Sequence, residues 1–302
     1  FPDARRPHNV RELPDDEPLR IGAFEVTAIP VDHSAPDARA FLVESAGARL
    51  LYSGDLRDHG RTGYRFARLL KDARLKGVDV LLLEATTVGQ PRGSHGFPAE
   101  RDVEDALVDL ARTRATALVL VASSGQTLDR LVSCFRAAKR SGRQLVIDPY
   151  QAFVLHQLAP LSKSIPQFDW DLVRVGFVSA HVKRLLDAGM ADLVWEMARK
   201  AKVRSGEIRE HPGRFLVAAR SNRPTARLLG AMNDPARVAV VWSMWRGYWP
   251  KDRHLRVFCE RNGVAPAFIH SGGHASPEAL RRLVRALKPK KVDWVHTEAD
   301  DA

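Results

Sequence analysis

The amino-acid sequence predicts an α/β protein in two parts, and three observations lead to this fold class. In the stretch from Val31 to Gly60, two short apolar alternations flank Ser45-Ala46-Gly47, a pattern typical of a β-hairpin. From Glu100 onward, helix and strand patterns alternate, as expected for a parallel sheet. The last segment of the chain returns to a strand, a turn, a helix and a strand.

The first part of the chain is expected to begin as a loop, because four prolines exclude a helix or a central strand from residues 1–20. Residues 78–84 (VDVLLLE) then form a nearly continuous apolar run, which is typical of a strand buried on both faces. The apolar residues of 64–76 recur at helical spacing. The predicted elements are strands at 24–31, 40–44, 48–53 and 78–84 and a helix at 64–76.

The middle part follows a loop over residues 87–98, whose glycines and prolines mark a domain boundary. Beyond this loop, segments with one apolar helical face alternate with short apolar runs. The predicted helices cover residues 100–112, 127–140 and 181–202. The predicted strands cover residues 117–122, 144–148, 172–178, 215–218 and 238–242.

The last part is expected to begin with a strand at 266–270 and a turn at Ser271-Gly272-Gly273. Ser276 then offers an N-cap, and Pro277 occupies the first helical position. Pro289 ends this helix, and a strand over 292–295 leads directly to His296.

The composition is that of an ordinary globular chain with a basic excess. Its 302 residues suggest about two domains. The formal net charge of +11 favours an anionic partner such as nucleic acid, although many basic proteins have no such partner. No apolar run reaches the ~18 residues of a membrane span, so no membrane partner is expected. Cys134 and Cys259 form no disulfide framework, and a cytoplasmic location is predicted.

Side chains that bind metals and protons lie next to several predicted strands. His33 and Asp55 each follow a strand. Glu84 ends one strand and His296 follows another, while His274 lies in the loop before the last helix. Imidazoles and carboxylates held at the ends of a rigid sheet suit zinc or manganese. Each residue also has a structural alternative: a hydrogen-bonded loop residue for His33, a loop cap for Glu84 and a polar turn residue for His274.

Five short segments, in order along almost the whole chain, resemble the motifs of one family. DHSAPDA and YSGDLRDHG resemble the third and fourth metal-ligand motifs of the metallo-β-lactamase fold, more narrowly of its ribonuclease J-like branch with the β-CASP insertion. LLLEATT, HSGGHAS and VDWVHTE are similar to the motifs of that insertion. The resemblance implies a metallo-β-lactamase αββα sandwich, truncated at the N-terminus, with an inserted β-CASP α/β domain. The implied domains are residues 1–96 and 259–302 for the sandwich and 97–258 for the insertion.

The resemblance also implies a role for each candidate residue. It makes His33 a ligand of one metal ion, Asp55 a bridge between two, and His296 a ligand of the second. His274 would touch the scissile phosphate or assist the leaving oxygen, and Glu84 would orient His274 or His296. The implied cofactors are two divalent ions, zinc first, with manganese and magnesium as alternatives.

The middle part offers residues for RNA. Ser123, Ser124 and Gln126 precede a predicted helix N-terminus, where free amides and the helix dipole favour phosphate, and Arg130 follows. Further basic residues and an aromatic stretch, VVWSMWRGYWP, suit a single strand with stacked bases. Structural alternatives are helix capping for the serines and core packing for Trp242 and Trp245. RNA is the predicted partner, with single-stranded DNA and self-association as open alternatives.

One signature of the metallo-β-lactamase fold, H-x-H-x-D-H, does not occur among the eleven histidines. The chain also opens on Phe1 rather than methionine, which indicates a truncated sequence. Without this motif the site would lack most of its ligands, so the chain as given is expected to bind metal weakly and to catalyse little.

The resulting functional prediction is a metal-dependent hydrolase of phosphodiester bonds, most simply a ribonuclease J-like RNA nuclease. Two alternatives stay open: an RNA-binding family member with a degenerate site, and a metallo-hydrolase of a small molecule. The basic charge argues against the latter. The sequence does not distinguish RNA from DNA, exonuclease from endonuclease, or zinc from manganese.

Overall fold

The protein is described by a computed structural model over residues 12–89, 99–113 and 116–297. These residues form two compact units. One unit contains the described part of residues 7–99 and 272–302, and the other contains the described part of residues 100–271. The first unit is therefore assembled from two segments that are distant in sequence, and we describe each unit separately.

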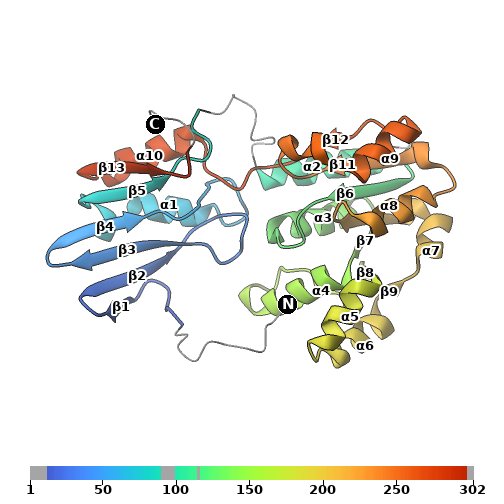
Figure 1. Cartoon of the computed structure of the whole chain (residues 1–302), viewed down its shortest axis with the longest axis horizontal. Helices are drawn as coiled ribbons and strands as arrows, with labels where there is room; N and C mark the ends of the chain where they lie inside the picture. Colours follow the sequence, from blue (N-terminus) through green and yellow to red (C-terminus); the bar gives the residue numbers. More distant parts are fainter. Residues whose placement is uncertain (1–11, 90–98, 114–115, 298–302) are drawn as a thin grey trace. The chain divides into compact units, whose positions relative to one another are not determined.

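The first unit is built on a six-stranded sheet with the order β1-β2-β3-β4-β5-β13 (Figure 1). Strands β1 to β4 are antiparallel, whereas β4, β5 and β13 run parallel. Because Val295 pairs with Glu84, the carboxyl ends of β5 and β13 lie side by side. The strands are β1 (Pro18–Ile21), β2 (Phe24–Pro30), β3 (Arg39–Ser45), β4 (Ala48–Tyr52), β5 (Val80–Glu84) and β13 (Lys291–Val295).

The predicted hairpin is β3 and β4, and a tight turn sets its register. Ser45 pairs with Ala48, so Ala46 and Gly47 alone form the connection. Both have positive φ, +49° and +81°, as the favoured two-residue hairpin turn requires. The hairpin brings the loop after β4, which carries Asp55, to the same edge of the sheet as the loop after β2, which carries His33.

Helices α1 (Tyr64–Lys71) and α10 (Pro277–Leu287) contribute to the core on one face of this sheet. Helix α10 begins as predicted, because the Ser276 hydroxyl accepts a hydrogen bond from the Ala279 amide at 3.1 Å and Pro277 follows the cap. A short 3₁₀ helix, η1 (Ala73–Leu75), connects α1 to β5. The centre of this core is Ile29, Val31, Leu42, Leu51, Phe66, Leu69, Leu81, Leu83, Leu280, Leu283 and Leu287.

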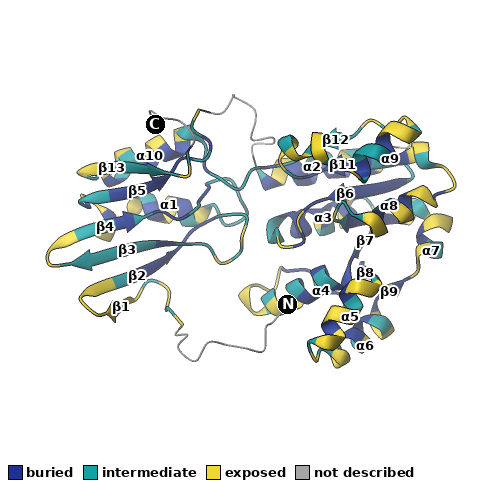
Figure 2. Cartoon of the chain, in the orientation of Figure 1, coloured by how far each residue is buried: buried dark blue, intermediate teal, exposed yellow. Residues whose placement is uncertain are grey.

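The second unit is built on a seven-stranded parallel sheet with the order β12-β11-β6-β10-β7-β8-β9. All five residues of β6 are fully buried, so this inner strand is covered on both faces, as Figure 2 shows. The strands are β6 (Leu118–Ala122), β7 (Gln144–Ile147), β8 (Val173–Gly176), β9 (Lys202–Val203), β10 (Phe215–Ala219), β11 (Val238–Trp242) and β12 (Ala267–Phe268).

Helices alternate with these strands along the chain, which confirms the predicted α/β class. The α-helices are α2 (Glu100–Arg112), α3 (Leu128–Arg140), α4 (Pro149–Leu158), α5 (Ser179–Asp187), α6 (Ala191–Lys200), α7 (Ser205–Glu210), α8 (Arg223–Gly230) and α9 (Leu255–Asn262). The 3₁₀ helices are η2 (Ala159–Leu161), η3 (Pro212–Arg214), η4 (Pro235–Arg237) and η5 (Arg246–Lys251).

Three sequence-based expectations differ from the structure. The single helix predicted at 181–202 is two helices, α5 and α6, because Gly189 between them has φ of +75° and ends the first. The predicted loop at 1–20 ends in β1, an edge strand whose first residue is Pro18 and which therefore needs no donor there. The predicted boundary at 258/259 falls inside α9, whereas the second unit extends to Ser271.

Across the described ranges, none of the helices combines the length and the apolar character that crossing a membrane requires.

Candidate metal centre

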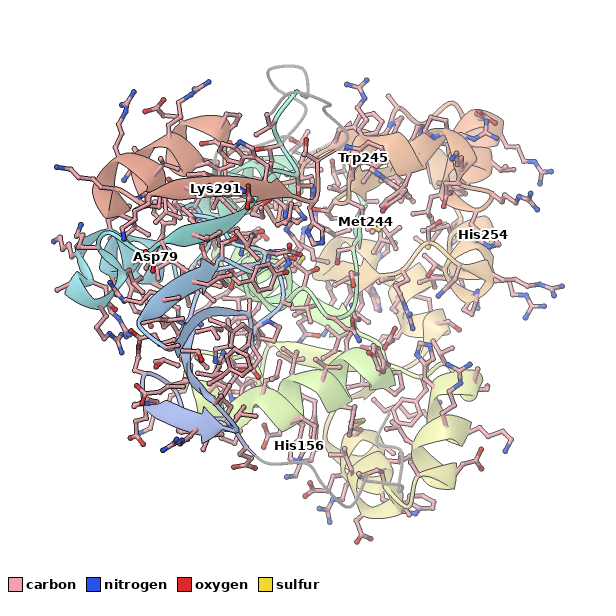
Figure 3. All side chains as sticks on the ribbon, turned by 60° about the vertical axis from the view of Figure 1, so that its left-hand side comes forward. Asp79, His156, Met244, Trp245, His254 and Lys291 are labelled. Atoms are coloured by element: carbon pink, nitrogen blue, oxygen red, sulfur yellow. The ribbon has the colours of Figure 1, made fainter. Side chains whose placement is uncertain are left out.

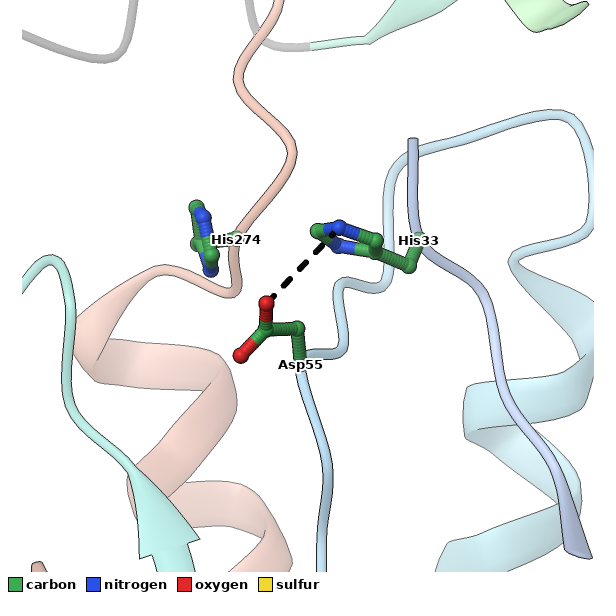
Figure 4. A group of neighbouring side chains, drawn as sticks. All are labelled: His33, Asp55 and His274. Atoms are coloured by element: carbon green, nitrogen blue, oxygen red, sulfur yellow. Dashed lines mark ion pairs between the residues drawn. The ribbon is translucent and has the colours of Figure 1, made fainter. Parts of the chain in front are cut away.

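Three loops of the first unit bring two imidazoles and a carboxylate together. His33 follows β2, Asp55 follows β4, and His274 precedes α10 (Figure 4). One potential ligand atom from each residue lies within 4.8 Å of the others. Nε2 of His33 lies 3.9 Å from Oδ2 of Asp55. We call these three residues the ligand group.

The hydrogen bonds of His33 present a lone pair to the ligand group. Its Nδ1 lies 2.6 Å from the carbonyl oxygen of Gly273, which can only accept, so we assign the proton to Nδ1. The Nε2 atom is then an acceptor, and it faces Asp55. Burial lowers the pKa of His33 below 6.5, and this effect outweighs the hydrogen bond to Gly273. His33 is thus held as a neutral ligand whose other nitrogen is fixed on a carbonyl, as in most metal-bound histidines.

His274 is held by Glu84, whose side chain is fully buried at the end of β5. The Nδ1 atom of His274 lies 3.4 Å from Oε2 of Glu84. Backbone amides fix this carboxylate, since Oε1 accepts from Ala275 at 3.1 Å and Oε2 from Thr86 at 3.2 Å. Burial opposes protonation of His274, but the neighbouring carboxylate of Glu84 outweighs burial and raises the pKa of His274. The imidazole also packs edge-on against His33, with ring centroids 5.2 Å apart.

His296 follows β13 and contacts the carboxylate of Asp55, at the oxygen that does not face His33. Its Nδ1 lies 2.9 Å from Oδ1 of Asp55, and its side chain is 57% exposed. The geometry thus groups His274, rather than His296, with His33 and Asp55, whereas the sequence analysis assigned His296 as a ligand and His274 to the phosphate. All five predicted residues meet at one edge of the sheet.

A buried ion pair, which sequence reasoning missed, connects the loops that carry the ligand group. The side chains of Asp32 and Arg57 are fully buried, with Nε of Arg57 3.4 Å from Oδ1 of Asp32. Arg57 also donates to the Gly272 carbonyl at 3.0 Å, next to the loop of His274. The Asp32 carboxylate further accepts from the Gly60 amide at 2.7 Å and the Thr62 hydroxyl at 2.8 Å. The sequence contained one indication of this ion pair: Asp32 directly precedes His33, and Arg57 lies two residues after Asp55.

The chain is similar to known proteins over most of its length. The family described as "Beta-lactamase superfamily domain" matches residues 1–121. The sequence is 32% identical over 292 residues to "Ribonuclease J" of two Mycobacterium tuberculosis strains, CDC 1551 / Oshkosh and ATCC 25618 / H37Rv, covering 94% of this chain. The protein has the metallo-β-lactamase fold and is similar to ribonuclease J. It spans about half the length of these relatives, 49% in each case.

A solved structure extends the likeness to the fold of nearly the whole ribonuclease J-like chain. The protein of unknown function from Enterococcus faecalis V583 superposes with a TM-score of 0.72 at 17% sequence identity. The match covers 97% of this chain and 64% of that one. The metallo-β-lactamase fold predicted from the sequence is confirmed, while the assignment of the second unit as a β-CASP domain stays a prediction.

The donor set of the ligand group fits one divalent metal ion, which the fold implies. Two imidazoles and one carboxylate provide three ligands, the number that leaves a position open for water or substrate. The Nδ1 atom of each imidazole has a protein partner, which is the Gly273 carbonyl for His33 and the Glu84 carboxylate for His274. For a second ion the described residues add His296 to Asp55.

Two of the four residues predicted to contact phosphate, Ser123 and Arg130, have buried side chains. The guanidinium of Arg130 is 1% exposed and pairs with Glu100 at 2.8 Å, so it is a structural cation of the second unit. Ser123, the residue after β6, is fully buried. Ser124 and Gln126 are exposed, and their contact with phosphate stays a prediction. Trp242 is 2% exposed and lies in the core, as the structural alternative had it.

Gly54 is required by the backbone next to Asp55. Its φ is +55°, and a Cβ there would clash with the carbonyl oxygen of Arg39. We expect Gly54→Ala to destabilise the first unit by about 2–4 kcal/mol, the sum of a strained φ and a steric clash. Gly77→Ala is the matched control, because Gly77 has φ of +61° but open space around it. Urea denaturation compares the two variants, and equal losses of stability would refute the steric argument.

Proposed function

We propose that the protein is a metal-dependent hydrolase that cleaves phosphodiester bonds in RNA. The observation that carries this proposal is the ligand group of His33, Asp55 and His274, held at one sheet edge by a backbone carbonyl and a buried carboxylate. The name of the relatives, Ribonuclease J, supports RNA as the substrate. The net charge of +11 supports a polyanion over a neutral small molecule.

In this proposal each side chain of the site has a role that follows from its position. A divalent ion in such a site lowers the pKa of bound water and neutralises charge on a phosphate. His33 and His274 would hold the ion with neutral nitrogens, and Asp55 would hold it with a carboxylate oxygen. Glu84 would keep the imidazole of His274 in place, and His296 would orient the far oxygen of Asp55, or bind a second ion with it. Zinc is the first candidate, because the donors are mostly nitrogen.

We expect Asp55→Asn to reduce RNA hydrolysis by more than about 100-fold while RNA binding is retained, since the loss of even an outer-shell group costs 10–100-fold. The measurement is turnover of a labelled RNA in parallel with its binding in EDTA. Asp58→Asn is the matched control, because Asp58 is a partly buried carboxylate three residues along that pairs with Arg282 at 3.2 Å. Hydrolysis by Asp55→Asn at the rate of Asp58→Asn would overturn the assignment.

A second candidate is an RNA-binding protein that does not cleave RNA. It is favoured by one observation: the described residues form a single group of three ligands, and a second ion would have only Asp55 and His296. Metal analysis separates the candidates, because this form would bind RNA and contain no stoichiometric metal. For either candidate we propose a cytoplasmic location, which suits the buried free thiols of Cys134 and Cys259.

A further inference from the structure

The second unit carries two large aromatic side chains on its surface, directly after β11. Trp245 precedes η5 and Tyr248 lies within it, and the two are 49% and 58% exposed (Figure 3 labels Trp245). Their rings meet edge-to-face with centroids 5.2 Å apart. Large exposed aromatics that touch one another contribute little to the core and mark interaction sites more often than isolated ones do. We call Trp245 and Tyr248 the aromatic platform.

The platform is held in place from below. The indole nitrogen of Trp242, which is buried in the core, donates to the carbonyl oxygen of Trp245 at 3.2 Å. A Cβ at Gly247 would clash with the indole ring of Trp245, so the ring lies directly against the backbone of Gly247. Because the backbone is anchored and the rings are exposed, a ligand meets preformed surfaces and little side-chain entropy is lost on binding.

The charges around the platform are basic. Arg246, Lys251 and Arg253 are exposed, and Arg246 lies over the ring of Phe268 at 4.5 Å. The segment 245–254 has one acidic residue, Asp252. Its Oδ1 accepts hydrogen bonds from the amides of residues 254, 255 and 256 at 3.1, 2.7 and 3.0 Å, so it serves the start of α9. The surface thus combines aromatic faces with cations.

We propose that the aromatic platform binds the bases of single-stranded RNA, with Arg246, Lys251 and Arg253 beside the phosphates. Stacking on aromatic faces with cations along the backbone is how proteins bind single strands without reading sequence. A protein partner with acidic side chains would use the cations but would not need two exposed aromatic rings. This inference rests on the proposed function for the identity of the polymer, but it concerns binding and requires no cleavage.

The test is the affinity of a fluorescently labelled oligouridine for the whole protein in EDTA, which prevents cleavage. We expect Trp245→Ala to weaken binding roughly 5- to 100-fold, the effect of losing one stacked base. Trp195→Ala is the matched control, because Trp195 is 71% exposed on α6 and should leave the affinity unchanged. Tyr248→Ala should resemble Trp245→Ala, and circular dichroism melts check that each variant folds.

Two further measurements identify the kind of contact. Heparin has anionic groups but no bases, so Trp245→Ala should bind it as the wild type does, whereas a loss for both ligands would overturn stacking. Replacement of Arg246 and Lys251 by glutamine should reduce the salt dependence of RNA binding, which Trp245→Ala should leave intact. Wild-type affinity in Trp245→Ala, or an equal loss in Trp195→Ala, would overturn the platform.

The outcomes also separate this inference from the proposed function. If the wild type binds oligouridine, Trp245→Ala does not, and neither hydrolyses RNA with metal added, the platform stands and the hydrolase proposal fails. If the wild type hydrolyses RNA and Trp245→Ala binds it normally, the hydrolase proposal stands and the platform fails. If the wild type binds heparin and no oligouridine, the platform is overturned, and a partner that carries acidic groups without bases is indicated.

Discussion

Arg57→Met is expected to destabilise the first unit by about 3–5 kcal/mol, the cost of leaving one charge of a buried pair uncompensated. The reason is that Asp32 would stay fully buried without its cation. The same variant releases the Gly272 carbonyl, which Arg57 holds at 3.0 Å, so the loop of His274 loses one of its attachments to the loop of Asp55. Urea denaturation followed by hydrogen exchange in peptides of each unit measures the loss where it occurs.

Arg130→Met is the control for this prediction. Arg130 and Glu100 form an ion pair of similar burial, 1% exposed on both sides, in the second unit. Both variants should lose stability to a comparable extent, but only Arg57→Met should weaken the binding of Co²⁺ to the ligand group. Removing both charges, as in Asp32→Asn with Arg57→Met, should recover part of the stability. A loss below about 1 kcal/mol in Arg57→Met would show that water or another group compensates Asp32.

The elements that the sequence predicted well are those with local signals. The hairpin turn depends on adjacent residues with positive φ, and the cap of α10 depends on Ser276 and Pro277 alone. Strand β11 has the predicted bounds, Val238–Trp242, because a short apolar run between helices allows few other assignments. The candidate residues converge because parallel strands β5 and β13 end at the same edge, which the strand pattern implies but does not prove.

The parts that sequence reasoning missed depend on partners distant in the chain. Arg130 looks like a surface cation beside a helix start, but Glu100, thirty residues earlier, pairs with it in the interior. The grouping of His274 with His33 depends on a hydrogen bond between Gly273 and His33 that spans 240 residues. The residues next to His274 and His296 in the sequence do not indicate which of the two lies beside His33. Only the three-dimensional structure places His274 in the ligand group.

His33→Ala is expected to weaken Co²⁺ binding by more than about 100-fold, because outer-shell partners of metal ligands already account for 10–100-fold. The alanine removes the Nε2 lone pair that faces Asp55 and leaves two of the three ligands. The measurement is a Co²⁺ titration followed by visible absorption, which requires no substrate. His59→Ala is the matched control, since His59 lies near the same Gly272 carbonyl, 3.1 Å from its oxygen, but outside the ligand group.

The same titration decides between the two histidines that the sequence and the geometry rank differently. His274→Ala should weaken Co²⁺ binding as strongly as His33→Ala, because its ligand atom lies within 4.8 Å of the other two. His296→Ala should leave the first Co²⁺ in place, because its contact is to the opposite oxygen of Asp55. If His296→Ala abolishes binding and His274→Ala spares it, the ion lies on the exposed side of Asp55, and His274 is free to meet the phosphate.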